Sequence, residues 1–189
     1  DTRRDFTLIG RMYDGAGIII SAHPSSPFRS VAELVAYAKA NPGKLNFASG
    51  SAVLQITGEM FKQEAGIDLR HVPYRGSSPA LLDLVGGRTQ VMFDSIAASL
   101  PHIRSGKLRA IAVASRARSA LLPDVPTVSE AGVPGYEAMS WYMLLAPAKT
   151  PAPIIQQIHH ETVAALKGKD MCDMLARGGT EAVGNTPKE

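Results

Sequence analysis

The feature that most constrains this chain is the regular alternation of short apolar segments with amphipathic ones, joined by glycine, proline and serine. The apolar segments predict strands at 16–21, 45–48, 69–74, 90–93 and 108–114. After most of them, apolar residues recur at the spacing of a helix that buries one face. Strands that alternate with helices favour an α/β fold built on a parallel sheet.

The predicted helices have recognisable ends. Ser30 and Glu33 have the spacing of a capping box, and the helix that they begin is expected to end at residues 41–43, because proline cannot continue the hydrogen-bond ladder. A second helix is expected to end at Gly66. The residues expected to face inward from this second helix are Val53, Ile56, Met60 and Phe61.

A third helix and a less regular region follow. Pro79 is expected at the first position of the third helix, whose apolar side is formed by Leu81, Leu82 and Val85. From residue 115 a connection rich in turns is expected, with a short helix capped by Thr127 and Glu130. The later elements expected are a strand at 138–146, a helix from 150–151 and a short helix from Asp170 to residues 178–179.

Charge and composition exclude several classes of protein. The net charge of +3 is small and its basic residues are scattered, so no nucleic-acid partner is expected. No apolar run approaches the roughly 20 residues of a membrane-spanning helix, so no direct membrane insertion is expected. A single cysteine, Cys172, excludes an internal disulfide and a CxxC pair. The polar start at residues 1–5 shows no signal peptide, as expected for a cytoplasmic, a processed or a truncated chain.

Three junctions between a strand and the next helix carry the residue types of an anion site. They are Ser49–Ala52, Arg75–Ser78 and Asp94–Ser95. In open parallel sheets, ligands bind at the carboxyl ends of the strands. The following helix starts offer free N–H groups and about half a positive charge each, which suits a carboxylate. The alternative interpretation is that these serines and glycines only cap helices.

The candidate ligand-binding residues are those of the first two junctions together with nearby side chains that are expected to orient the ligand. They are Ser49, Gly50, Ser51, Ala52, Gln55, Tyr74, Gly76, Ser77, Ser78 and Asp94.

No constellation of catalytic or metal-binding residues is recognisable. The Walker loop, the GxGxxG fingerprint and the GxSxG elbow are absent. His159 and His160 are adjacent on a predicted helix, so their side chains diverge by about 100° and do not chelate one metal. We therefore expect no catalytic residue, no metal site and no cofactor. An α/β enzyme acting on a small acid through Asp94 or a serine is kept as an alternative.

Ten motifs, in order along essentially the whole chain, resemble the substrate receptors of tripartite tricarboxylate transporters, the Bug-type family. The motifs are residues 42–47, 58–61, 71–76, 83–87, 91–94, 100–103, 106–110, 122–127, 134–136 and 144–147.

The resemblance implies a periplasmic-binding-protein type II fold, in which two α/β lobes with parallel or mixed sheets flanked by helices hold a ligand between them. By this resemblance, residues 1–17 form part of the first lobe and residues 18–110 the lobe that grips the ligand. Residues 111–189 are the returning crossing strand and the rest of the first lobe. The resemblance also implies a periplasmic location, a small organic carboxylate as ligand, and delivery to the membrane permease of the transporter. A sensory protein that presents its ligand to another partner is the alternative.

Two departures from the family pattern bear on the ligand. Members of the family carry a further βα segment before the part matched here and a longer helix after it, so this chain is expected to be part of a longer protein. The loop after Phe47 is shorter than is usual, and Gln55 stands where the family has a histidine. An amide donates a hydrogen bond to a carboxylate without carrying charge, so the ligand itself is not predicted.

Overall fold

The computed structural model describes residues 2–15, 17–177 and 179–186. The chain divides into two compact units, one formed by Asp1–Ala16 with Ser140–Glu189 and the other by Gly17–Met139. The second boundary therefore lies at residues 139–140, about thirty residues later than the expected return at residue 111.

The later boundary has a physical reason. Val128, Val133 and Tyr136 are buried in the same core as Phe28 and Phe61. The segment is also held by backbone hydrogen bonds, because the Ala138 N–H donates to the Ala114 carbonyl oxygen at 2.8 Å. Residues 111–139 consequently pack with residues 17–110 and belong to the larger unit. The assignment of the two units to the lobes of a ligand-gripping receptor stays a prediction.

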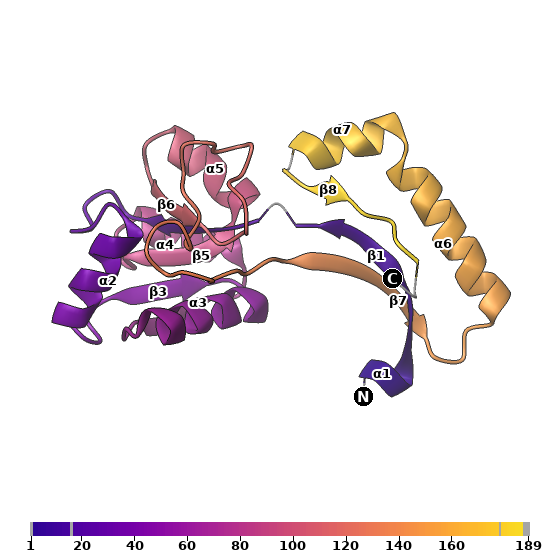
Figure 1. The fold of residues 1–189 in the computed structure, drawn as a ribbon, viewed down its shortest axis with the longest axis horizontal. Coiled ribbons are helices and arrows are strands. Elements are labelled where there is room, and N and C mark those ends of the chain that lie inside the picture. The colour runs from indigo at the N-terminus through magenta and orange to yellow at the C-terminus, as the bar shows by residue number, and fades with distance from the viewer. Residues whose placement is uncertain (1, 16, 178, 187–189) are drawn as a thin grey trace. The chain divides into compact units, whose positions relative to one another are not determined.

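The larger unit, Gly17–Met139, is built on a five-stranded sheet (Figure 1). Its strands in spatial order are β4 (Arg70–Pro73), β3 (Asn46–Ser49), β5 (Val91–Ser95), β2 (Ile18–Ala22) and β6 (Arg109–Val113). β3 runs parallel to β4 and β5, whereas β2 runs antiparallel to β5 and β6. The sheet is thus mixed: the parallel arrangement favoured by the alternation of strands and helices holds for β4, β3 and β5, and β2 departs from it.

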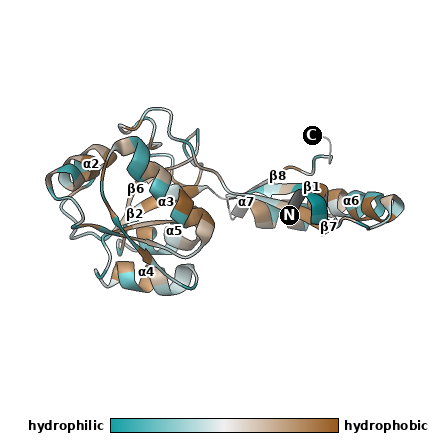
Figure 2. Cartoon of the chain, turned by 90° about the horizontal axis from the view of Figure 1, so that it is seen from below, coloured by the Kyte–Doolittle hydropathy of each residue, from teal (hydrophilic) through white to brown (hydrophobic). Residues whose placement is uncertain are grey.

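Helices cover both faces of this sheet. They are α2 (Val31–Ala40), α3 (Ala52–Ala65), α4 (Ser77–Val85) and α5 (Ile96–Arg104). Side chains alternate across the strands: Phe47 packs with α2 and α3, while Ala48 next to it packs with Leu81 and Leu84 of α4. Each helix carries both hydrophobic and hydrophilic residues (Figure 2), so it buries one face only.

The helix ends follow the predicted chemistry in most places. The Ser30 Oγ accepts the Glu33 N–H at 3.2 Å, and the Glu33 carboxylate in turn accepts the N–H of Arg29, one residue before the expected partner. α3 ends at Gly66, whose φ of 62° is left-handed. α4 begins at Ser77, so Pro79 is its third residue and not its first.

The inward face of α3 differs from the expected one. Thr57, Gly58 and Phe61 are buried, whereas the expected core residues Val53, Ile56 and Met60 are exposed. Gly58 explains this orientation, because a Cβ there would lie 2.4 Å from the Phe47 ring, so the helix packs closely against β3 at this point. In α4, Leu82 is likewise exposed although Leu81 is buried.

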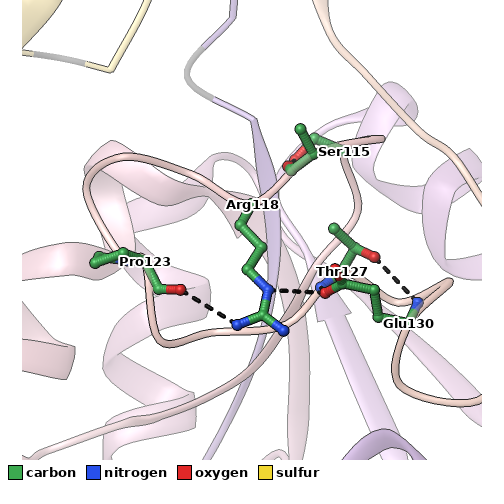
Figure 3. Close-up of polar contacts among 6 residues, drawn as sticks. Ser115, Arg118, Pro123, Thr127 and Glu130 are labelled. Atoms are coloured by element: carbon green, nitrogen blue, oxygen red, sulfur yellow. Dashed lines mark hydrogen bonds and ion pairs between the residues drawn. The ribbon is translucent and has the colours of Figure 1, made fainter.

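The connection after β6 contains turns in place of the short helix that was expected. Its capping box still forms: the Thr127 N–H donates to Glu130 Oε2 at 2.9 Å, and the Glu130 N–H donates to Thr127 Oγ1 at 3.1 Å. Arg118 crosses the loop, and its Nε donates to the same Glu130 oxygen at 2.9 Å (Figure 3). Glu130 therefore ties two parts of this loop together.

Replacing Glu130 by glutamine is expected to lower the melting temperature at pH 7. The N–H of Thr127 and the guanidinium of Arg118 hold the pKa of Glu130 below its ordinary value. A carboxyl group with a depressed pKa stabilises the fold above its unfolded-state pKa, and this contribution is lost as the pH falls through the folded-state pKa. Melting curves between pH 3 and 7 should show the difference shrinking toward acid. A difference that persists unchanged at acid pH, or an equal effect of the exposed control Glu137→Gln, would contradict this role.

The smaller unit, Asp1–Ala16 with Ser140–Glu189, contains a three-stranded antiparallel sheet in the order β7 (Trp141–Pro147), β1 (Phe6–Asp14) and β8 (Glu181–Ala182). Neither β1 nor β8 is among the strands predicted from the sequence. The helices of this unit are α1 (Thr2–Asp5), α6 (Ala152–Leu166) and α7 (Lys169–Arg177). α6 and α7 pack on the sheet through contacts such as Ile9 with Ile155 and Met12 with Leu175.

Candidate functional site

The predicted site residues lie along one edge of the sheet in the larger unit. Because β3, β4 and β5 run parallel, their carboxyl ends meet at this edge, with Ser49 of β3 beside Pro73 of β4. α3, α4 and α5 begin directly after these strands (Figure 1). The edge therefore brings three helix N-termini together, as the strand and helix pattern predicts.

Two of the turns at this edge are in direct contact. A Cβ added at Gly50 would lie 2.4 Å from the Gly76 carbonyl carbon and 2.5 Å from the Ser77 nitrogen. The strands hold this contact in register, because the Tyr74 N–H donates to the Ser49 carbonyl oxygen at 3.0 Å. The turn after β3 and the turn after β4 thus lie side by side, and only glycine fits at position 50.

The first turn of α3 is capped by its own serine. The Ser51 Oγ accepts the Leu54 N–H at 3.4 Å, so this hydroxyl serves the helix. The N–H groups of Ala52 and Val53 lie in the first turn of α3, where the helix itself offers them no carbonyl oxygen as acceptor. Gln55 is exposed one turn further along. Two backbone donors and one amide are consequently available at this helix start.

The first turn of α4 differs from its neighbours, because its N-cap residue Gly76 has no side chain to cap it. α2, α3 and α5 each have a serine N-cap whose Oγ accepts a backbone N–H. Gly76 has a φ of 115°, a conformation that residues with a Cβ rarely adopt. The N–H groups of Ser77 and Ser78 therefore form an uncapped helix start, the kind of site that binds anions.

Asp94 lies at the end of β5 and is only 1% exposed. Its Oδ1 accepts the Ser77 hydroxyl at 2.7 Å and the Ser95 N–H at 2.8 Å. Asp94 thus connects the first residue of α4 with the N-cap of α5. Burial raises the pKa of Asp94 above its ordinary value, although the two hydrogen bonds act in the opposite direction.

Tyr74 lies at the same edge, but its hydroxyl is engaged elsewhere. It donates to Asp83 Oδ2 of α4 at 2.8 Å, and the other carboxylate oxygen of Asp83 pairs with Arg88. Burial, followed by the hydrogen bond to Asp83, raises the pKa of Tyr74. The structure therefore does not direct this hydroxyl to the two turns, and Tyr74 contributes to the edge through its backbone N–H, which bonds to Ser49.

His71 is a residue of this edge that the sequence analysis did not include among the site residues. Its Nε2 lies 2.8 Å from the Ser49 Oγ, and its ring packs against Phe47 at 4.8 Å between centroids, tilted by 35°. Burial lowers the pKa of His71, which favours the neutral ring. Strand alternation signals this contact, because His71 pairs with Phe47 in the parallel register and Ser49 lies on the same face two residues further on.

The described residues contain no cluster of side chains suited to a metal. Within residues 2–15, 17–177 and 179–186, no three histidine, cysteine or acidic side chains are placed to hold a metal ion. A cavity of about 480 Å³ lies in the smaller unit, whereas the predicted site residues belong to the larger one. It is lined by Thr7, Leu8, Thr150, Ala152, Ile155, Gln156 and Thr186. This lining has no charged side chain, so the cavity suits an apolar group better than an anion.

Comparison with known proteins places the chain in a family. The sequence profile described as "Tripartite tricarboxylate transporter family receptor" matches residues 1–188. The chain belongs to this family. The resemblance inferred from the ten motifs is therefore confirmed, and the family is one of receptors and not of enzymes.

Individual relatives agree with this assignment. The chain is 35% identical over 175 residues to BugT of Bordetella pertussis, a match that covers 91% of this chain and 53% of BugT. It thus spans about half the length of the curated relatives that it matches.

Two solved structures from Rhodopseudomonas palustris share the fold. Rpa4515 with adipate has a TM-score of 0.91 and 34% identity, and the match covers 100% of this chain and 63% of that one. MatC with bound malate has a TM-score of 0.85 and 30% identity, covering 93% of this chain and 60% of MatC. The predicted α/β periplasmic-binding-protein fold, with mixed sheets flanked by helices, is confirmed.

The family is represented among these structures by periplasmic binding proteins such as BugD. In the described part of this chain, no helix combines the length and the apolar character that crossing a membrane requires.

Proposed function

We propose that this chain is the carboxylate-gripping part of a periplasmic receptor, which binds a small organic acid and delivers it to the membrane permease of a tripartite tricarboxylate transporter. The observation that carries the proposal is the contact between Gly50 and the peptide joining Gly76 to Ser77. This contact brings the free N–H groups at the starts of α3 and α4 to one place, where the partial positive charges of two helices add.

The relatives support the chemical class of the ligand. The structures of Rpa4515 and MatC contain adipate and malate, both small dicarboxylates. We propose that the chain binds one carboxylate of such an acid through the N–H groups of residues 52–53 and 77–78, with Gln55 and Ser78 as further donors. Closure of a second lobe over the ligand stays a prediction from the family resemblance.

Titration calorimetry with adipate and malate tests this function. We expect saturable binding with one ligand per chain, and we expect chromatography of the ligand after prolonged incubation to recover it unchanged. Adipamide and 1,6-hexanediol are matched controls, because they keep the carbon chain of adipate and lack its charge. Equal binding of the uncharged analogues, or conversion of the acid to a product, would contradict a carboxylate receptor.

A further inference from the structure

The carboxyl group of Asp94 is only half satisfied. Four buried side-chain atoms of the described residues lack a hydrogen-bond partner, and Asp94 Oδ2 is the only carboxyl oxygen among them. Both donors that reach Asp94, the Ser77 hydroxyl and the Ser95 N–H, bind the other oxygen. A buried carboxylate oxygen without a partner loses its hydration and gains nothing in return, so it requires an explanation.

The position of Asp94 supplies one. Ser77 donates its hydroxyl to Asp94, and its N–H is one of the uncapped donors of α4. A carboxylate bound at this N–H consequently lies near Asp94, because the hydroxyl group of the same serine bonds to Asp94. Gly76, Ser77 and Ser95 are each partly exposed while Asp94 is 1% exposed, so the carboxyl group lies directly beneath the surface residues of this edge.

A plain carboxylate does not complete this arrangement. It brings a second negative charge close to Asp94 and offers no hydrogen-bond donor to Oδ2. An acid with a hydroxyl or ammonium group on the neighbouring carbon offers that donor, and the donor reduces the repulsion between the two carboxylates. The raised pKa of Asp94 agrees with an ionised form that lacks a stabilising partner until such a donor arrives.

We propose that Asp94 makes the site selective for carboxylates that carry a hydrogen-bond donor, a hydroxyl or an ammonium group, on the carbon next to the bound carboxylate, and that this donor pairs with Asp94 Oδ2. The proposal rests on the proposed carboxylate-binding function and names its ligand class. Sites built to pair a polar group of the ligand reject analogues that lack the group, because their own buried atom is then left unpaired.

Two matched series of acids test the proposal on the whole chain by titration calorimetry. Succinate, malate and aspartate share one carbon skeleton and differ by a hydrogen, a hydroxyl or an ammonium group. Phenylacetate, mandelate and phenylglycine repeat the comparison on an aromatic skeleton. In at least one series, we expect a substituted acid to bind about tenfold to a hundredfold more tightly than the plain one, which corresponds to one hydrogen bond to a charged group. Comparing the affinity of the hydroxyl-bearing acid with that of the ammonium-bearing acid identifies which donor the site prefers.

The variant Asp94→Asn assigns this selectivity to Asp94. Asparagine keeps the oxygen that accepts from Ser77 and Ser95 and replaces the Oδ2 acceptor by a donor. We expect the preference for the ammonium-bearing acid to be lost, the affinity for the plain acid to stay equal or rise, and the melting temperature at pH 7 not to fall. The control Asp68→Asn changes an exposed carboxylate in the loop before β4 and should leave the preference intact.

The outcomes separate the two proposals. If the unaltered chain binds plain and substituted acids equally well, or if Asp94→Asn keeps the preference, the role of Asp94 is wrong and the carboxylate receptor stands. If Asp94→Asn unfolds the chain, Asp94 is structural, and the selectivity of the unaltered chain alone decides the ligand class. If neither adipate nor any acid of the two series binds, the proposed function is contradicted as well. If adipate binds and no acid of either series does, the role of Asp94 is wrong and the carboxylate receptor stands.

Discussion

Replacing Gly50 by alanine is expected to weaken carboxylate binding by about tenfold or more, equivalent to about 1.4 kcal/mol. The added Cβ would lie 2.4 to 2.7 Å from backbone atoms of Gly76 and Ser77, and backbone cannot move aside as a flexible side chain does. The two turns must therefore separate, which pulls the helix starts apart and removes donors from a shared ligand. The same overpacking is expected to cost about 1–3 kcal/mol of folding stability.

Gly86→Ala is the matched control for this variant. Gly86 follows α4 with a φ of −79°, and a Cβ there would lie 3.3 Å from the Leu82 carbonyl oxygen and 3.7 Å from the Asp83 carbonyl oxygen, farther than any of the backbone contacts at Gly50. We expect its affinity for adipate or malate, measured by calorimetry, to stay within about threefold of the unaltered chain, less than 1 kcal/mol. An unchanged affinity in Gly50→Ala would show that the contact between the two turns has no part in binding.

Phe61→Ala is expected to lower the free energy of unfolding of the larger unit by about 3–5 kcal/mol, as is usual for a fully buried phenylalanine. The Phe61 ring is completely buried and lies edge-on to Tyr136 at 5.8 Å, with Phe93 at 5.7 Å. Its removal leaves a cavity where α3, β5 and the 128–138 segment meet. Urea unfolding followed by far-ultraviolet circular dichroism measures this change. Tryptophan fluorescence does not, since the single Trp141 lies in the smaller unit.

Ile56→Ala on the same helix provides the comparison. Ile56 is 60% exposed, so its truncation is expected to cost less than about 0.5 kcal/mol. A large loss for Ile56→Ala and a small one for Phe61→Ala would mean that α3 packs through the face that the apolar spacing first suggested.

This contrast illustrates where sequence patterns were sufficient and where they failed. Residues 53, 56, 60 and 61 are all apolar, so helical spacing alone favoured one broad inward face. The close approach of Gly58 to the Phe47 ring decides the orientation instead, and a glycine gives no hydrophobic signal. The helix ends were predictable because the capping side chains at Ser30 and Ser51 act within a few residues.

Strand direction was less predictable than strand existence. β2 is apolar and completely buried, as a central strand of a parallel sheet would be, yet it runs antiparallel to both neighbours. Burial on two faces determines composition and leaves direction open. β1 was missed because its apolar residues are interrupted by Gly10 and Arg11, and because its pairing with β7 depends on residues more than a hundred positions away.

The candidate site was predictable to the extent that it depends on strand ends. Parallel strands bring their carboxyl ends together, so the alternation of strands and helices was enough to predict that the turns containing Gly50 and Gly76 lie close to each other. The hydrogen-bond partners of the side chains within the site could be assigned only from the structure. Asp94 accepts a hydrogen bond from the Ser77 hydroxyl of α4. The Tyr74 hydroxyl donates to Asp83 of α4 and is therefore not directed at the two turns.

The most direct test of the carboxylate site is a titration of the isotopically labelled chain with malate and with adipate, followed by amide nitrogen–proton correlation spectra. The N–H groups of residues 52–53 and 77–78 would donate to the ligand, so we predict the largest shift changes at residues 50–53 and 76–78, with a common dissociation constant. Shift changes concentrated instead around the apolar cavity near Thr7 and Ile155 would contradict the account. So would saturable binding that leaves the amides of both turns unmoved.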